Sequence, residues 1–215
     1  MFRDFFWRSS LARFPSAGVI ILLIVALLTV LGIIILFSAS GAMHANPTAL
    51  LKKQLIWLFL SVLAAVFAFK LDLEKIRPWI PWIGGGAVLL LLLVLVPGIG
   101  VKVNGAQRWL DFGFMRLQVS EIGKLGLLFS LAHYLAIHRR SINSLGKGFA
   151  YPFLILSLFV IPIFLEPDYG TAFLCGLIGC VLFFVSGMQL RFLLPVASLA
   201  LVLFSIAIFF NPERL

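Results

Sequence analysis

Residues 17–39 read AGVIILLIVALLTVLGIIILFSA, an apolar run of 23 residues without a charged side chain. As a helix rising 1.5 Å per residue, this run is long enough to cross the roughly 30 Å hydrocarbon core of a bilayer. Backbone groups must be paired inside lipid, and the run lacks the alternation of a barrel strand, so it predicts a transmembrane helix. Six further apolar runs follow, at 54–69, 79–101, 117–137, 149–165, 169–187 and 192–210. The sequence therefore predicts an all-α, polytopic transmembrane helical bundle with seven spans.

The composition of the chain excludes a soluble globular domain. Of its 215 residues, 62% are hydrophobic and only 12% are charged, whereas a soluble domain carries about 25% charged residues. The net charge of +9 does not indicate nucleic-acid binding, because the Lys and Arg residues are scattered between apolar runs. Membrane lipids with anionic headgroups are the expected partners of these cations. Cys175 and Cys180 share one apolar run without further ligand types nearby, so neither a disulfide nor a metal site is predicted.

The Lys and Arg residues in the loops predict the orientation of the spans. With a cytoplasmic N-terminus, ten of the 17 Lys and Arg fall in inside segments. Residues 1–16 then form a cytoplasmic, interfacial N-terminal segment, 17–210 the transmembrane domain, and 211–215 the start of an outside loop. Four basic residues within 102–124 fall in outside segments, although basic residues usually favour cytoplasmic loops. Their place outside needs another reason.

The fourth predicted span carries two charged residues. Glu121 and Lys124 are three residues apart, so they lie on one face of a helix and can pair. Charged residues inside a span are costly, about 2.5–3.5 kcal/mol each on insertion scales, and often mark functional sites. Two interpretations stay open: a structural ion pair whose lysine reaches toward the surface, or a polar cavity that meets a lipid headgroup.

Two loops on the same predicted side of the membrane add polar residues. Arg108 can bind a phosphate with two parallel hydrogen bonds, or it can form an ordinary interfacial anchor with Trp109. Asp168 is placed to cap the sixth predicted helix, or to hold a cation or a substrate hydroxyl. The residues alone do not separate these alternatives.

Three stretches together resemble the SEDS family of bacterial cell-wall proteins (shape, elongation, division and sporulation), which includes FtsW and RodA. They are 103–110 (VNGAQRWL), 117–125 (LQVSEIGKL) and 166–172 (EPDYGTA). The resemblance begins near residue 17 and runs to the end of the chain. The approach at 96–100 (VPGIG) is more similar to the FtsW branch.

The resemblance implies a peptidoglycan glycosyltransferase that joins lipid II units at the outer face of the bacterial cytoplasmic (inner) membrane, in cell division or elongation. Lipid II is a disaccharide-pentapeptide on undecaprenyl diphosphate. It further implies a class B penicillin-binding protein, a single-span transpeptidase, as partner, and a divalent cation, Mg or Mn, as cofactor. On this basis we assign Arg108 and Lys124 to diphosphate binding, Glu121 to orienting Lys124 or holding a metal, and Asp168 to the same cavity.

The chain departs from the family pattern in sequence and in length. Val119 stands where the family usually has Pro, and Glu166 where it usually has Gln; neither position is assigned a charged role. Family members have ten spans, and their catalytic aspartate lies in an outside loop that would follow Leu215. The resemblance therefore implies a fragment or a truncated product, whose catalytic residue is unknown within these 215 residues.

Two functions from other classes stay open. A transporter, or flippase, of lipid-linked precursors would also need a polar cavity that opens to one leaflet. It would further need polar residues continuing to the inner leaflet, and the spans show few of them. A non-enzymatic membrane scaffold of the division or elongation machinery would need neither a base nor a substrate site.

Overall fold

A computed structural model describes residues 16–209, except 44–46, 104–105, 114–115 and 143. Most of the predicted interfacial segment 1–16, and all of 211–215, lie outside the described residues. Internal contacts divide the chain into two compact units, Met1–Leu71 and Asp72–Leu215, and each is described by itself. The single transmembrane domain over 17–210 stays a prediction.

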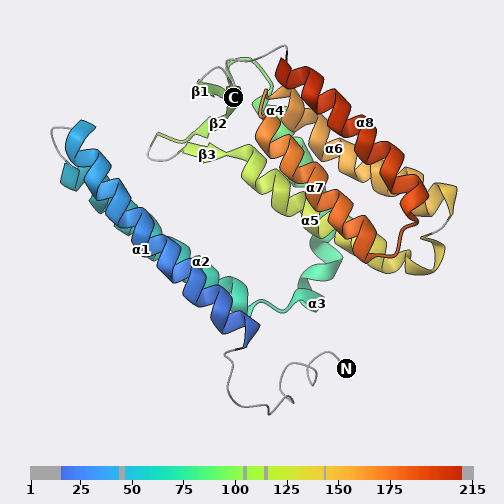
Figure 1. The fold of residues 1–215 in the computed structure, drawn as a ribbon, viewed down its shortest axis with the longest axis horizontal. Helices are drawn as coiled ribbons and strands as arrows, with labels where there is room; N and C mark the ends of the chain where they lie inside the picture. Colours follow the sequence, from blue (N-terminus) through green and yellow to red (C-terminus); the bar gives the residue numbers. More distant parts are fainter. Residues whose placement is uncertain (1–15, 44–46, 104–105, 114–115, 143, 210–215) are drawn as a thin grey trace. The chain divides into compact units, whose positions relative to one another are not determined.

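The first unit is a hairpin of two apolar helices, α1 (Ala17–Met43) and α2 (Pro47–Lys70), which lie side by side (Figure 1). Two hydroxyl groups of this hairpin are paired within their own helices. The hydroxyls of Thr29 and Ser61 donate to backbone carbonyls about one turn earlier, at 2.7 and 2.8 Å. Such local pairing is what a hydroxyl needs in a lipid environment, where water is absent.

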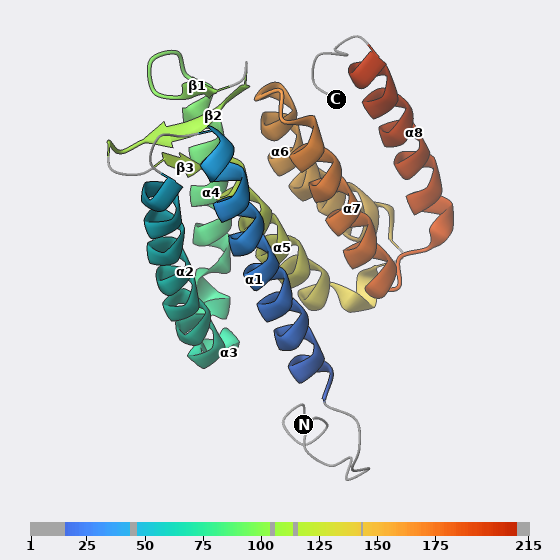
Figure 2. The same ribbon diagram turned by 60° about the vertical axis from the view of Figure 1, so that its left-hand side comes forward.

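The second unit holds the remaining helices and a small sheet. Its helical elements are α3 (Leu73–Ile76), η1 (Arg77–Trp79), α4 (Ile80–Val94), α5 (Val119–Ile137), η2 (Arg139–Ser141), η3 (Leu145–Ala150), α6 (Tyr151–Leu165), α7 (Tyr169–Val185) and α8 (Leu190–Phe209). The helices α4 to α8 run alongside one another, with the sheet at one end of the bundle (Figure 2).

Several helical segments have the length and composition of membrane spans. Within the part of the chain that the structure describes, four are long and apolar enough to cross a bilayer: Ala17–Ser40, Leu50–Lys70, Leu73–Val94 and Leu145–Leu165. Tyr169–Val185 is apolar but shorter. The predicted class, an all-α polytopic membrane protein, is confirmed.

The third predicted span, 79–101, is corrected at both ends. Helical structure begins at Leu73, because the side chain of Asp72 caps it by accepting from the backbone N–H of Glu74 at 3.1 Å. The helix ends at Val94, shortly before Pro97 and before Gly98, whose φ of +90° requires a glycine. The last predicted residues of the span belong instead to a turn and a strand.

The small sheet was not predicted from the sequence, which indicated only a loop before the fourth span. Its strands β1 (Val101–Val103), β2 (Ala106–Asp111) and β3 (Arg116–Gln118) are antiparallel, in the order β1-β2-β3. The Gln107 side chain donates to the carbonyls of Val94 and Val96 at 3.0 and 3.1 Å, which fastens β2 to the end of α4. Strand β3 then runs directly into α5, so the sheet fixes where that helix begins.

Glycines let α4 and α5 approach closely. Leu91 on α4 is fully buried, and a Cβ on Gly123 would lie 3.0 Å from its side chain. A Cβ on Gly126 would lie 2.6 Å from the Cβ of Ala87 and 3.0 Å from the ring of Phe159. Small residues at helix contacts allow such packing in membrane proteins, where dispersion replaces much of the hydrophobic effect.

We expect Gly126→Ala to lower the free energy of unfolding by about 1–3 kcal/mol, because the added methyl overpacks the α4–α5 contact. Gly85→Ala is the matched control, since a Cβ at Gly85 meets nothing within 4 Å. In a helix, that control should be neutral or stabilising by up to about 1 kcal/mol. Thermal unfolding of both variants in detergent checks the difference, and equal losses of stability would contradict the packing described above.

Candidate functional site

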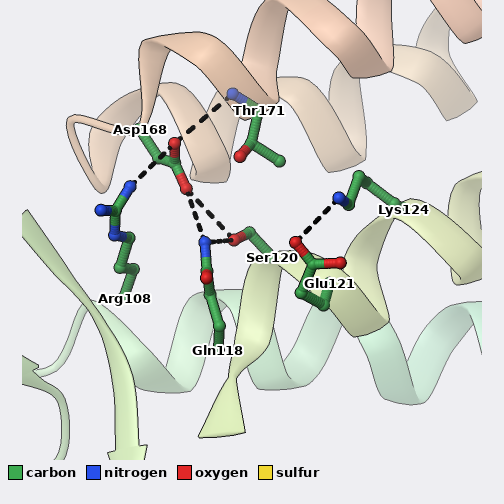
Figure 3. A network of polar contacts seen from close by, with 7 residues as sticks. All are labelled: Arg108, Gln118, Ser120, Glu121, Lys124, Asp168 and Thr171. Atoms are coloured by element: carbon green, nitrogen blue, oxygen red, sulfur yellow. Dashed lines mark hydrogen bonds and ion pairs between the residues drawn. The ribbon is translucent and has the colours of Figure 1, made fainter. Parts of the chain in front are cut away.

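Several polar residues of the second unit gather where its sheet meets the starts of α5 and α7. Strand β2 brings Arg108, the junction of β3 and α5 brings Gln118 and Ser120, and the turn from α6 to α7 brings Asp168. Figure 3 shows these side chains converging from three separate parts of the chain. The predicted site residues Arg108 and Asp168 are therefore in direct contact.

Asp168 is the centre of this polar network, which we define as Arg108, Gln118, Ser120, Asp168 and Thr171. Its Oδ1 accepts from Arg108 Nη1 at 3.0 Å and from the backbone N–H of Thr171 at 3.4 Å. Its Oδ2 accepts from Gln118 Nε2 at 3.1 Å and from Ser120 Oγ at 3.2 Å. The Asp168 side chain is only 7% exposed, so these donors replace the water that an ionised carboxylate requires.

The local sequence explains the placement of the acceptor and its donors. Asp168 is the N-cap of α7, as its position before the sixth predicted helix suggested. Gln118 is the N-cap of α5 in an extended conformation, and it makes no cap bond with its side chain. Its amide is therefore free to donate to Ser120 at 3.0 Å and to Asp168, which joins the starts of two helices. The Asp168 carboxylate therefore caps α7 and pairs with Arg108 at the same time.

Glu121 and Lys124 form a second ion pair one turn along α5. Lys124 Nζ lies 2.8 Å from Glu121 Oε1, as their spacing predicted. The Lys124 side chain is 21% exposed and that of Glu121 57% exposed, so solvent reaches this pair more easily than the polar network.

Acidic partners account for most of the basic residues that gather within 102–124. Arg108 pairs with Asp168 and Lys124 with Glu121. Arg116 Nε lies 3.0 Å from Asp111 Oδ2 in the exposed hairpin. The backbone N–H of Gly113, and then Arg116, hold the pKa of Asp111 below its usual value. Local ion pairs therefore satisfy charges that run against the usual loop bias.

Sequence reasoning gave no role to three residues of this region, namely Gln118, Ser120 and Glu166. Gln118 and Ser120 stand within the stretch 117–125, but their acceptor is Asp168, 50 and 48 residues away along the chain. The sequence assigned Glu166 no charged role. Its side chain is fully buried, and burial together with the nearby Asp168 raises its pKa to about 8, against a smaller opposing effect of Arg108.

The described residues do not form an evident site for a divalent cation. No group of three or more His, Cys, Asp or Glu side chains in that part of the chain is arranged to hold a metal. Both oxygens of Asp168 are occupied by donors, and Glu121 is held by Lys124. The Mg or Mn ion implied by the resemblance stays a prediction, and we derive no step through it.

Fold and site together define a polytopic helical membrane protein with a charged site at one end of its helices. The chain belongs to the FtsW/RodA/SpoVE family of cell cycle proteins, whose family model matches residues 19–215.

Two relatives and two solved structures illustrate the similarity. The probable peptidoglycan glycosyltransferase FtsW of Thioalkalivibrio sulfidiphilus is 39% identical over 83% of this chain and 46% of its own. That of Legionella pneumophila is 34% identical over 87% and 50%. The crystal structure of the rod shape determining protein RodA from Thermus thermophilus aligns with a TM-score of 0.66 and 32% identity, over 82% of this chain and 57% of that one. A peptidoglycan synthase complex, described as coordinating polymerization and crosslinking, aligns with a TM-score of 0.65 and 30% identity, over 86% and 54%.

The chain spans about half the length of the curated relatives that it matches.

Proposed function

We propose that the polar network and the Glu121–Lys124 pair bind lipid II for a peptidoglycan glycosyltransferase that polymerises it at the outer face of the cytoplasmic membrane. The observation that carries this proposal is the placement of two cations, each held by a carboxylate, near the starts of α5 and α7: Arg108 on β2 and Lys124 in the second turn of α5. A diphosphate carried on a lipid has its charge at the boundary between hydrocarbon and water. The names and folds of the relatives support the same reaction class.

The charges suit a diphosphate because neither cation is fully used by its partner. Arg108 gives one terminal nitrogen to Asp168 and keeps further N–H donors, which match phosphate oxygens in geometry. Lys124 is a compact charge with three donors, of which Glu121 takes one. The carboxylates orient both cations before the ligand arrives, which reduces the entropy lost on binding.

Glycosyl transfer requires a base, a nucleophile and stabilisation of the leaving group. A base removes the proton of the acceptor sugar hydroxyl, and its oxygen then attacks the anomeric carbon of the donor. The bond from that carbon to the diphosphate oxygen breaks, and the lipid diphosphate leaves with additional negative charge. Arg108 and Lys124 would stabilise this charge. We assign the base to no residue of this chain.

The wider setting follows from the same proposal. A lipid II polymerase works in the bacterial inner membrane with its polar site outside, which corresponds to the cytoplasmic N-terminus expected from the basic residues. A class B penicillin-binding protein would crosslink the polymer that this protein makes. The similar peptidoglycan synthase complex, whose title couples polymerization to crosslinking, supports such a partner.

Ligand titration tests this function. The 215-residue chain in nanodiscs should bind fluorescent lipid II about tenfold or more tightly than a neutral diacylglycerol, because charge-assisted hydrogen bonds to the diphosphate are added. Undecaprenyl phosphate, with one phosphate, should fall between them. Equal affinity for all three lipids would contradict the proposal. Polymer formation with the penicillin-binding protein present would support polymerisation, whereas translocation across liposomes without polymer would favour a transporter.

A further inference from the structure

The carboxyl group of Glu166 is buried and has no hydrogen-bond partner within the part of the chain that the structure describes. Glu166 follows the last residue of α6, its side chain has 0% exposure, and neither carboxyl oxygen has a partner among the described residues. An ionised carboxylate in this situation loses its hydration without any replacement, which is among the most costly arrangements in a protein. A neutral carboxylic acid avoids most of this penalty.

The charges around Glu166 also favour a neutral acid. Asp168, at the start of α7, opposes its ionisation, and Arg108, on β2, favours it. Helices α4 and α6 contribute no Asp, Glu, Lys, Arg or His to the surroundings. On α5, Glu121 and Lys124 neutralise each other as a pair. Two ionised carboxylates would thus share a single guanidinium, and one bound proton restores the balance of charge.

Arg108 is the group that the two carboxyls can share. Its Nη1 is committed to Asp168 at 3.0 Å, but its Nε is buried and has no partner in the described part of the chain. The unpaired donor thus belongs to the ion-pair partner of Asp168, which lies two residues beyond the unpaired acceptor oxygens of Glu166 in the same turn. Asp168 also accepts hydrogen bonds from Gln118, Ser120 and the Thr171 backbone, so its carboxylate keeps three donors if Arg108 leaves it.

We propose that Glu166 is a proton-holding positioning residue: its neutral acid leaves Arg108 on Asp168, and its ionisation draws Arg108 toward Glu166. The site then has two arrangements, which the external pH selects. Below the pKa of Glu166, Arg108 is held in place by Asp168. Above it, the Glu166 carboxylate competes for the guanidinium. The consequence for ligand binding rests on the proposed function, whereas the proton on Glu166 does not.

Infrared spectroscopy tests the proton directly and needs no ligand. The chain in nanodiscs should show the carbonyl stretch of a protonated carboxylic acid at pH 6, and this band should disappear with a midpoint near pH 8. The band should be missing in Glu166→Gln. In Asp168→Asn, which keeps Glu166, the midpoint should fall, because the opposing negative charge is gone. Arg108→Met should raise the midpoint. A wild-type protein without the band at pH 6, or a band that persists in Glu166→Gln, would overturn the proposal.

Lipid II binding tests the switching of Arg108. Between pH 7 and pH 9, wild-type affinity should fall about tenfold, the effect of one charge-assisted hydrogen bond. Glu166→Gln, which mimics the neutral acid, should change little over the same range. Parallel profiles for the two proteins would overturn the switching of Arg108. Absence of lipid II binding at every pH would contradict the proposed function, and the infrared result would still decide whether Glu166 holds a proton.

Discussion

Asp168→Ala is expected to lower the free energy of unfolding by about 2–4 kcal/mol. The substitution removes the acceptor of Arg108, Gln118, Ser120 and the Thr171 backbone, and it leaves these donors in a largely buried place. Breaking a fully buried ion pair costs about 3–5 kcal/mol. The expected loss is smaller here because Arg108 is 27% exposed and can recover some hydration. Chemical unfolding in detergent measures the loss.

The hairpin pair Asp111–Arg116 is a matched control for burial. Its nitrogen–oxygen distance is 3.0 Å, the same as that of Arg108–Asp168, but its side chains are 31% and 57% exposed. Asp111→Ala should therefore have a much smaller effect than Asp168→Ala. A double-mutant cycle with Arg108→Met should give a coupling of about 1–3 kcal/mol between Arg108 and Asp168. A coupling near zero, or equal losses at the two aspartates, would show that Asp168 does not organise the site.

The long apolar runs predicted most of the helices, because a span needs little more than length and the absence of charge. The boundaries were less predictable where local chemistry decides them. The Asp72 cap begins a helix earlier than the apolar run starts, and Pro97 with Gly98 ends it sooner. Strands β1 and β3 have three residues each, too few for a periodic pattern, and their pairing depends on contacts with β2.

The candidate site divides in the same way between local and distant contacts. The Glu121–Lys124 pair is set by spacing on one helix, so the sequence predicted it. The cap formed by Asp168 is equally local. The contact of Arg108 with Asp168 and the isolation of Glu166 depend instead on how β2 and the turn from α6 to α7 meet in space. Spacing along the chain carries no signal for such contacts.

Lys124→Met is expected to weaken lipid II binding about 30-fold or more with little loss of stability. An exposed pair three residues apart on a helix contributes about 0.2–0.5 kcal/mol, and methionine retains most of the aliphatic volume of lysine. The charge lost from a diphosphate site is worth more, about 2–3 kcal/mol, because hydrogen bonds from a cation to phosphate are strong in a partly buried place. Nanodisc titration and thermal unfolding of the same preparation measure the two effects.

Lys102→Met removes the same charge from the exposed face of β1 and is the control for general attraction of anionic lipid. Its effect on lipid II affinity should be small and should decline as salt is added, because exposed charges are screened. The effect at Lys124 should persist in salt, since the proposed contact with the diphosphate is direct. Equal effects of the two substitutions would reduce the role of Lys124 to surface charge, and a large loss of stability in Lys124→Met would make the ion pair structural. Weak binding with a stable fold is the combination that only a ligand-binding lysine produces.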